Sequence, residues 1–278
     1  DKDTSRGLGD VYKRQGDGTV VAIGAYGNDG NGSDSGHVRV YENNNGTWTQ
    51  IGSDLDGEAS EDNFGTSVSL SNDGSIVAIG GIYNAGVNGD QSGHVRVYEN
   101  NNGTWTQIGS DIDGESSSDY FGWSVSLSDD GSVVAIGGIY NDGNGSNSGH
   151  VRLYKNNNGT WTQIGSDIDG EANEDYSGWS VSLSGDGSAV AIGAPNNDGG
   201  GSNSGHVRVY EDIGRTTLSF TTLDNVAPTL SSSTPEDNAT LVALDSDIVL
   251  NFSEAVDVES GNIVIYKSSD DSVVETID

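Results

Sequence analysis

The sequence contains no cysteine and no methionine, only 3 prolines, and 11 basic residues against 43 acidic ones. Without cysteine, the chain can form neither disulfides nor thiolate metal sites. Its formal net charge of -32 opposes binding to nucleic acids and anionic membranes, because these carry charge of the same sign. It also lacks any run of about 18 consecutive apolar residues, the length that a membrane-spanning helix needs. We therefore predict a protein that neither binds nucleic acid nor inserts directly into a membrane.

Glycine, in contrast, is abundant at 42 residues, and much of it lies within an internal repeat. The four histidines of the chain fall at positions 37, 94, 150 and 206, so the repeat unit is 56–57 residues long. Asp-Gly pairs that begin at positions 17, 73, 130 and 186 keep the same step. A period of this length is typical of repeat architectures in which each unit is one supersecondary element.

One complete unit begins at Phe121 and contains four short segments of strand character, WSVSLS, SVVAIGG, HVRLYK and TWTQIGS. An Asp-Gly pair separates the first two segments and an Asn-Gly pair separates the last two. These dipeptides tolerate the positive φ angles of tight hairpins. The middle connection, YNDGNGSNSG, is a longer polar loop, and no segment has a helical pattern. Each unit is therefore predicted to be a four-stranded antiparallel meander.

Side-chain alternation indicates how these meanders pack. In the second strand of the unit, Val134 and Ile136 point to one face while Ala135 and Gly137 point to the other. A sheet with one bulky face and one small face can stack on a copy of itself, as the blades of a β-propeller do. We therefore predict an all-β fold, with a partial β-propeller of four-stranded antiparallel blades over residues 16–224.

The repeat resembles the FG-GAP family, which includes the propellers of integrin α subunits. The resemblance rests on FGTSVSLSNDGSIVAIGG at 64–81, FGWSVSLSDDGSVVAIGG at 121–138 and SGWSVSLSGDGSAVAIGAP at 177–195. It covers about residues 16–212. It implies that each unit is a propeller blade. A closed ring in this family has more blades than the present chain supplies.

Two end segments fall outside the repeat. Residues 5–15, SRGLGDVYKRQ, resemble the translation of a sequencing-library adapter, so we set residues 1–15 aside as non-native. Residues 225–278 resemble a bacterial Ig-like domain of the S-layer and adhesin type, through APTLSSSTPEDNA, IVLNFSEAV and GNIVIYKSSDDSVV. This resemblance implies part of an Ig-like β-sandwich, since a whole one needs roughly 100 residues. We expect the repeats and the Ig-like segment to belong to a longer natural protein.

Acidic residues cluster after the last strand of each complete unit, in the phrases SDLDGE and SDIDGE. Carboxylates grouped around a glycine are the ligands that a hard cation such as Ca²⁺ prefers. The candidate calcium ligands are Asp54, Asp56 and Glu58, then Asp111, Asp113 and Glu115, and finally Asp167, Asp169 and Glu171. The pattern is incomplete for an EF-hand-like loop, because glycine stands where the first aspartate would be. A solvated acidic turn is the alternative.

The histidines are a weaker candidate for a metal or catalytic site, because each lies at an equivalent position of a different unit. The repeat keeps equivalent positions apart, whereas zinc needs three or four ligands at one point. We predict instead that His and Arg of the HVRVY strand bind backbone groups or carboxylates of the next blade. Trp48, Trp105 and Trp161 repeat once per unit on a strand, so we predict that they serve packing rather than a stacking platform for a ligand. No serine lies in a nucleophile elbow, so we predict no catalytic residue and no cofactor besides the candidate calcium.

These features predict a non-catalytic binding or adhesion module of a large secreted or cell-surface bacterial protein. Its loops, rich in asparagine, aspartate and glycine, would present polar groups to a protein or carbohydrate ligand. The alternative is an accessory propeller region of a secreted hydrolase. Propellers host many functions, so the fold does not decide between the two.

Overall fold

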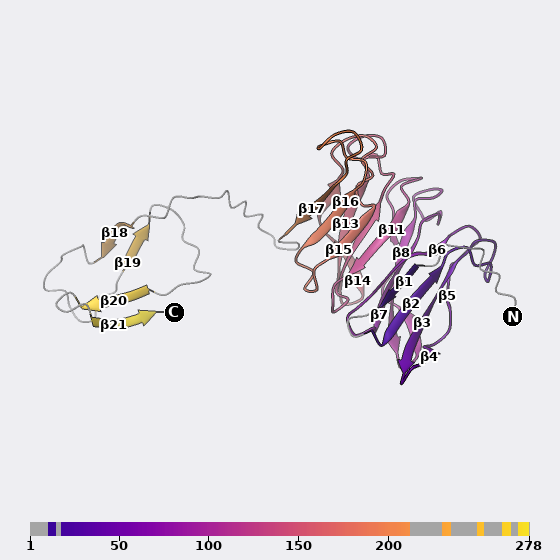
Figure 1. The fold of residues 1–278 in the computed structure, drawn as a ribbon, viewed down its shortest axis with the longest axis horizontal. Coiled ribbons are helices and arrows are strands. Elements are labelled where there is room, and N and C mark those ends of the chain that lie inside the picture. Colours follow the sequence, from indigo (N-terminus) through magenta and orange to yellow (C-terminus); the bar gives the residue numbers. More distant parts are fainter. Residues whose placement is uncertain are drawn as a thin grey trace. The chain divides into compact units, whose positions relative to one another are not determined.

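The computed structural model describes residues 11–14, 18–211, 230–234, 249–252, 263–267 and 272–277. The chain divides into two compact units, Asp1–Leu218 and Ser219–Asp278. All regular elements in the described residues are β-strands, which confirms the all-β prediction. In the first unit, four antiparallel sheets lie side by side (Figure 1). No helix long and apolar enough to cross a membrane occurs within the described ranges.

We name the four sheets blades 1 to 4 in chain order. Blade 1 contains β1 (Val11–Arg14), β2 (Val20–Ala25), β3 (His37–Asn44), β4 (Thr47–Gln50) and β5 (Leu55–Asp56). Blade 2 contains β6 (Phe64–Leu70), β7 (Ile76–Gly81), β8 (His94–Asn101), β9 (Thr104–Gln107) and β10 (Ile112–Asp113). Blade 3 contains β11 (Phe121–Leu127), β12 (Val133–Gly138), β13 (His150–Asn157) and β14 (Thr160–Asp169). Blade 4 contains β15 (Ser180–Leu183), β16 (Val190–Ala194) and β17 (His206–Tyr210).

Each blade is an antiparallel meander, as predicted, except that the short strands β5 and β10 pair with β3 and β8, and that blade 4 has three strands in the described residues. In blade 3 the order is β11-β12-β13-β14. The outermost hairpins turn at the Asn-Gly pairs, where Asn158 has φ 52° and Gly159 has φ 86°. Positive φ at both positions defines the type I′ turn that matches the twist of paired strands.

The hydrophobic core lies between the blades. One buried cluster joins Ala78 and Val95 of blade 2 to Val134 and Ile136 of blade 3. A second joins Ala135 of blade 3 to Val190 and Ile192 of blade 4. The small face of one blade therefore receives the bulky face of the next, as the alternation predicts.

Glycine permits the closest approach between blades. A Cβ atom on Gly137 of β12 would overlap the backbone carbonyl oxygen of Gly178, which lies just before β15. Gly80 and Gly122 meet in the same way between blades 2 and 3. A side chain at these positions would hold the blades apart at one end.

The structure changes one boundary and adds strands in the second unit. β1 lies within the segment that was set aside, yet it pairs with β2 from Val11↔Gly24 to Arg14↔Val21. Backbone groups make this pairing, so the edge of β2 can accept an extended segment of any sequence. Blade 1 thus begins before the predicted boundary at residue 16, while the adapter resemblance stays a prediction.

In the second unit, β18 (Leu230–Thr234) pairs with β19 (Val249–Phe252), and β20 (Ile263–Lys267) pairs with β21 (Ser272–Ile277). β19 and β20 fall in the phrases IVLNFS and NIVIYK that carry the Ig-like resemblance.

Candidate functional site

Long connections gather at one end of the blades. The tight Asp-Gly and Asn-Gly turns lie at the opposite end, which we call the hairpin end. The long-loop end comprises residues 26–36, 57–63, 82–93, 114–120, 139–149, 170–179 and 195–205. In blades 1 to 3, one asparagine fixes the long loop to the following connection, as when the Asn144 side-chain amide donates to the Gly170 carbonyl at 2.9 Å. Loops held in this way are organised before any ligand arrives.

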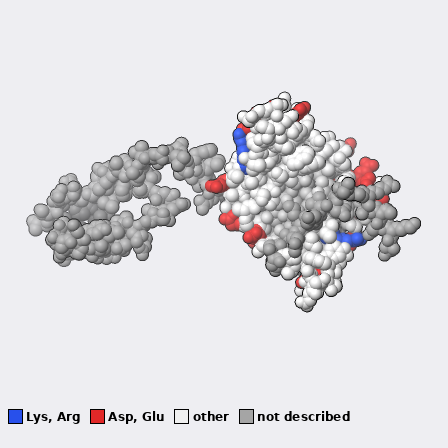
Figure 2. All heavy atoms as spheres, viewed as in Figure 1, with Lys and Arg blue, Asp and Glu red and all other residues white. Residues whose placement is uncertain are grey.

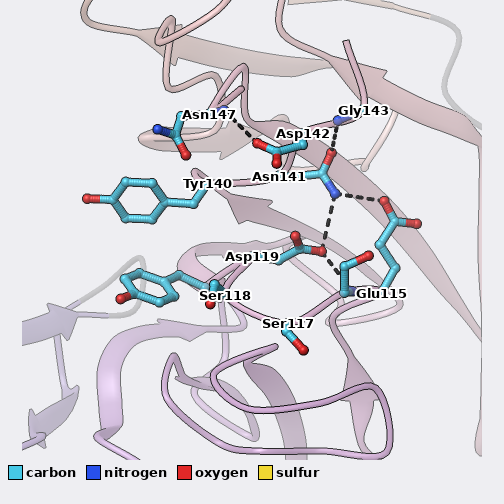
Figure 3. A pocket seen from close by; sticks show the side chains of 11 residues that line it. Glu115, Ser117, Ser118, Asp119, Tyr140, Asn141, Asp142, Gly143 and Asn147 are labelled. Atoms are coloured by element: carbon cyan, nitrogen blue, oxygen red, sulfur yellow. Dashed lines mark hydrogen bonds between the residues drawn. The ribbon is translucent and has the colours of Figure 1, made fainter. Parts of the chain in front are cut away.

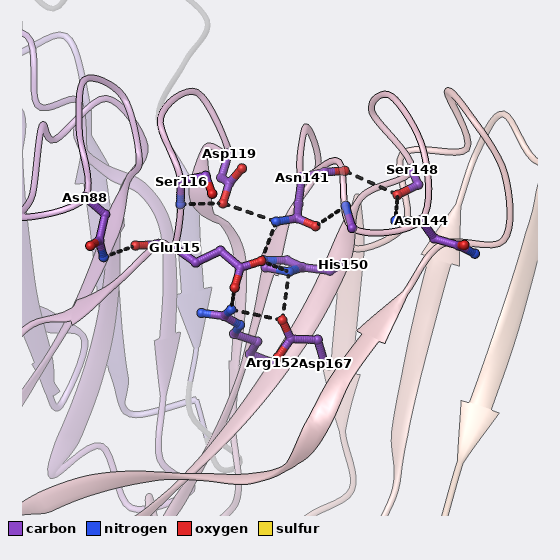
Figure 4. Close-up of polar contacts among 12 residues, drawn as sticks. Asn88, Glu115, Ser116, Asp119, Asn141, Asn144, Ser148, His150, Arg152 and Asp167 are labelled. Carbon is purple, nitrogen blue, oxygen red and sulfur yellow. Dashed lines mark hydrogen bonds and ion pairs between the residues drawn. The ribbon is translucent and has the colours of Figure 1, made fainter.

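Below these loops, an arginine bridges carboxylates from two neighbouring blades (Figure 4). Arg152 of β13 donates to Asp167 of its own blade at 2.9 Å and also pairs with Glu115 from the connection out of blade 2. The same arrangement joins Arg96, Asp111 and Glu58 one blade earlier. We call each group a seam cluster, because it closes the seam between two blades.

A glycine in the outer strand places the aspartate of each seam cluster. Gly109 and Gly165 have φ angles of 73° and 69° and interrupt the regular pairing of that strand. Such a bulge redirects the following side chains, so Asp167 turns toward Arg152. His150 shares a strand face with Arg152, is fully buried, and places its Nδ1 atom 3.6 Å from the Asp167 carboxylate.

The cationic surroundings favour the charged form of these aspartates. Burial alone would raise the pKa of Asp111, but the side chains of His94, Arg96 and Gln107 outweigh it and hold that pKa well below its usual range. His150, together with Gln163 and Arg152, lowers the pKa of Asp167 in the same way. By contrast, burial and the nearby charge of Asp111 raise the pKa of Asp113.

The structure does not gather the predicted calcium ligands of one unit around a single point. The first aspartate of each triplet, at positions 54, 111 and 167, binds the arginine of its own blade. The glutamate, at 58, 115 and 171, pairs with the arginine of the following blade. The middle aspartate, at 56, 113 and 169, lies on an outer strand opposite a histidine backbone.

Other groupings of possible ligand atoms do form. Glu58, His94 and Asp111 lie within 4.8 Å of one another, as do the equivalent Glu115, His150 and Asp167, and in blade 1 His37, Asp54 and Asp56. In each described seam, however, guanidinium already supplies positive charge to the same carboxylates. Calcium would have to compete with arginine there, and calcium binding stays a prediction.

The expectation is confirmed for arginine, with one difference, but not for histidine. The arginines meet carboxylates of a neighbouring blade, but these come from the preceding connection, because that connection runs directly over the seam. The ring nitrogens of His94 and His150 are buried without a hydrogen-bond partner among the described residues. The packing role of tryptophan is confirmed at two positions. The indole N–H groups of Trp105 and Trp161 donate across the seam to Ile51 and Ile108 carbonyls, both at 2.9 Å. Trp48, which has no preceding blade beside it in the described residues, is 44% exposed.

A pocket of about 490 Å³ opens at the long-loop end, between the connection from blade 2 to blade 3 and the β12–β13 loop (Figure 3). Its lining consists of Glu115, Ser116, Ser117, Ser118, Asp119, Tyr120, Tyr140, Asn141, Asp142, Gly143 and Asn147. Asn141 fixes its acidic side, donating to Glu115 at 2.7 Å and to the buried Asp119 at 3.2 Å. Asp142 accepts the Asn147 backbone N–H at 2.7 Å.

The two tyrosines of this pocket belong to a continuous row of aromatic rings. Tyr120 meets Tyr83 at a centroid distance of 5.0 Å and Tyr140 at 4.7 Å. The row continues from Tyr140 to Tyr176 at 5.5 Å, then to Trp179 and Trp123 at 6.4 and 5.0 Å. We call Tyr83, Tyr120, Tyr140, Tyr176, Trp179 and Trp123 the aromatic row. It follows the long-loop end from blade 2 to blade 4.

Sequence reasoning missed the aromatic row, although one signal points to it. The positions of Tyr120 and Trp123 correspond to Asn63 and Thr66 one unit earlier. Tyr120 and Trp123 recur one unit later as Tyr176 and Trp179, so these rings are shared by two consecutive units and are absent from the first.

Comparison with known families agrees with this architecture. The FG-GAP repeat family matches residues 111–154 and 166–210, which contain the inner three strands of blade 3 and of blade 4. The chain contains FG-GAP repeats. The bacterial Ig-like domain family matches residues 224–278, which places that domain after the repeats. FG-GAP and bacterial Ig-like domains are typical of extracellular or cell-surface proteins.

Solved structures similar to this chain are distant, each with 13% sequence identity. A protein described as a 6-phosphogluconolactonase from Bacteroides uniformis has a TM-score of 0.46, covering 72% of this chain and 49% of its own. A protein described as TolB from Agrobacterium tumefaciens has a TM-score of 0.42, and the match covers 75% of this chain and 62% of that protein. Hydrazine synthase of Kuenenia stuttgartiensis has a TM-score of 0.42, and the match covers 72% of this chain and 45% of that protein. The chain thus spans less than two thirds of each, and likeness at this level says nothing of activity. No curated protein matches the sequence.

Proposed function

We propose that this chain is a non-catalytic binding module of a secreted or cell-surface protein, and that its long-loop end is the ligand face. The observation that carries the proposal is the pocket beside Tyr120 and Tyr140, set in a row of aromatic rings where the repeats differ from one another. Tyrosine and tryptophan offer large, rigid contact surfaces with a polar tip, so they are common in binding sites.

The residues that repeat most regularly support the non-catalytic assignment. His94 and His150 are fully buried and lie beside the arginines of the seam clusters. Their repetition follows from the blade-to-blade contact, which leaves the long loops as the face that can specialise. Among the charged side chains that Figure 2 shows at the edges of the described blades, acidic ones outnumber basic ones, which disfavours anionic partners.

The proposal is tested by presenting the full chain to a panel of extracellular matrix proteins and immobilised glycans. We expect at least one specific ligand, and we expect Tyr120→Ala combined with Tyr140→Ala to abolish its binding. Trp48→Ala is the matched control, because Trp48 is an exposed aromatic residue at the hairpin end. Binding that survives the double change but is lost in Trp48→Ala would place the ligand at the wrong end and contradict the proposal.

A further inference from the structure

Resting on this proposed function, we infer that the ligand is a neutral glycan chain, bound along the aromatic row with one sugar residue in the Tyr120–Tyr140 pocket. A pyranose ring has faces of C–H groups and a rim of hydroxyl groups. It therefore needs aromatic surfaces beside hydrogen-bonding side chains, and the pocket offers both.

The polar lining fits hydroxyl groups. Three consecutive serines, 116 to 118, are exposed at the pocket, and their hydroxyls can both donate and accept. The Asp142 carboxylate is also exposed and can accept from a sugar hydroxyl. Charge-assisted hydrogen bonds of this kind are stronger than neutral ones, and they fix orientation.

The charges of the lining select against other classes of glycan. Glu115, Asp119 and Asp142 all line the pocket, and no lysine or arginine does. A sulfate or uronate group would enter among like charges with no basic partner, which costs free energy. The chain as a whole carries a formal charge of -32 and repels anionic polymers. Neutral sugars avoid this penalty.

The size of the pocket distinguishes a sugar from a metal ion. Calcium needs six to eight oxygen ligands at about 2.3–2.6 Å, which is a far smaller space than about 490 Å³. A volume of this order suits an organic group. The continuation of the row through Tyr176 to Trp179 and Trp123 suits a chain of linked rings rather than a single one.

Backbone conformation gives a second, independent indication that the tyrosines serve more than packing. Tyr120 and Tyr176 both have φ 53°, in the left-handed region that disfavours bulky side chains. Asn63 occupies the equivalent position after blade 1 at φ 52°, and asparagine tolerates that conformation well. The chain thus holds a ring twice where its own repeat shows that asparagine serves the fold. Unfavourable conformations of this kind are typical of functional positions.

The full chain should be applied to an array of neutral and anionic oligosaccharides, with a glycine–lysine peptide as a cationic probe. We expect binding to neutral linear oligosaccharides only, and little change in the dissociation constant between low and high sodium chloride, since neutral ligands are not screened. The best array ligand is then titrated by calorimetry. Tyr140→Ala and Trp179→Ala should each weaken it about tenfold or more, and Trp48→Ala should leave it unchanged.

Tyr120→Asn separates ligand binding from packing. It installs the residue that the preceding unit carries, so the variant should fold with an unchanged or higher melting temperature and still lose glycan binding. A lower melting temperature with unchanged affinity would show that the row only packs, and would overturn the inference. So would binding confined to anionic glycans or to the lysine peptide. If a protein ligand instead binds and is lost in Tyr140→Ala, the glycan inference fails while the proposed function stands.

Discussion

Replacing Arg152 by leucine should destabilise the seam between blades 2 and 3 much more than the same change at Arg208 destabilises the last seam. Both arginines occupy the same position of the repeat and pair with the glutamate of the preceding connection. Arg152 is buried and also binds Asp167, whereas the Arg208 side chain is 47% exposed. The two changes therefore remove the same group from different surroundings.

The magnitude follows from what each change leaves behind. Removing one partner of a buried ion pair costs about 3–5 kcal/mol, since the remaining charge stays buried without compensation. The side chains of Asp167 and Glu115 are 24% and 37% exposed, so water screens them in part. We therefore expect the lower end, about 3 kcal/mol, for Arg152→Leu. Water screens an exposed pair almost completely, so Arg208→Leu should cost much less than Arg152→Leu.

Urea unfolding at pH 7, followed by tryptophan fluorescence, measures both changes. A pH series adds a second test. His150, Gln163 and Arg152 hold the pKa of Asp167 below its ordinary value of 3.8, so this carboxylate stabilises the fold above that pH and the contribution is lost as pH falls toward the lowered pKa. Without Arg152 the pKa should rise, and acid destabilisation should begin at higher pH. Equal losses of stability in the two variants, or an unchanged acid limb, would refute the importance of the seam cluster.

Three further changes probe the blade contacts and the candidate cation. Trp161→Phe removes the hydrogen bond to the Ile108 carbonyl and should lower the free energy of unfolding in urea by about 1 kcal/mol. Trp48→Phe should lower it by less than about 0.5 kcal/mol, and equal losses would contradict the role of Trp161 in the seam. Gly137→Ala must push back the next blade and should lower the free energy of unfolding by about 2 kcal/mol. Gly193→Ala, whose new methyl group meets only a serine side chain of its own blade, should lower it by less in the same assay. Millimolar calcium should raise the melting temperature modestly, and more in Arg152→Leu because the competing guanidinium is gone. No shift in melting temperature, together with no heat of binding by calorimetry, would show that the acidic residues do not bind calcium.

The strands and turns could be predicted from sequence because each is specified locally. Two-residue alternation and the Asn-Gly dipeptide act over a few residues, and the first three units repeat both. The contacts of the acidic segments SDLDGE and SDIDGE could not be predicted in the same way. Whether Asp167 faces solvent or Arg152 depends on the bulge at Gly165, which inverts the direction of the side chains after it.

The glutamates show a different limit of sequence reasoning. Glu115 follows Asp113 by two residues, yet it pairs with an arginine of the next blade, 37 positions along the chain. That contact depends on how one blade stacks on another, and no local pattern contains it. The candidate cation site was therefore predicted from residues that are neighbours in sequence, whereas the structure brings together residues from two blades that meet at a seam.

Repetition and departure from repetition carry different information in this protein. A seam cluster must match the blade on either side, so its His and Arg recur in all four units, and its Asp and Glu in the first three, whatever the protein binds. The long-loop end faces no such constraint, and there Asn63 and Thr66 give way to Tyr120 and Trp123 in the next unit. If binding followed the repeated residues, each seam would be an equal site. Because the rings occur only from blade 2 onward in the described blades, we expect one extended site, whose affinity depends on the number of contiguous rings.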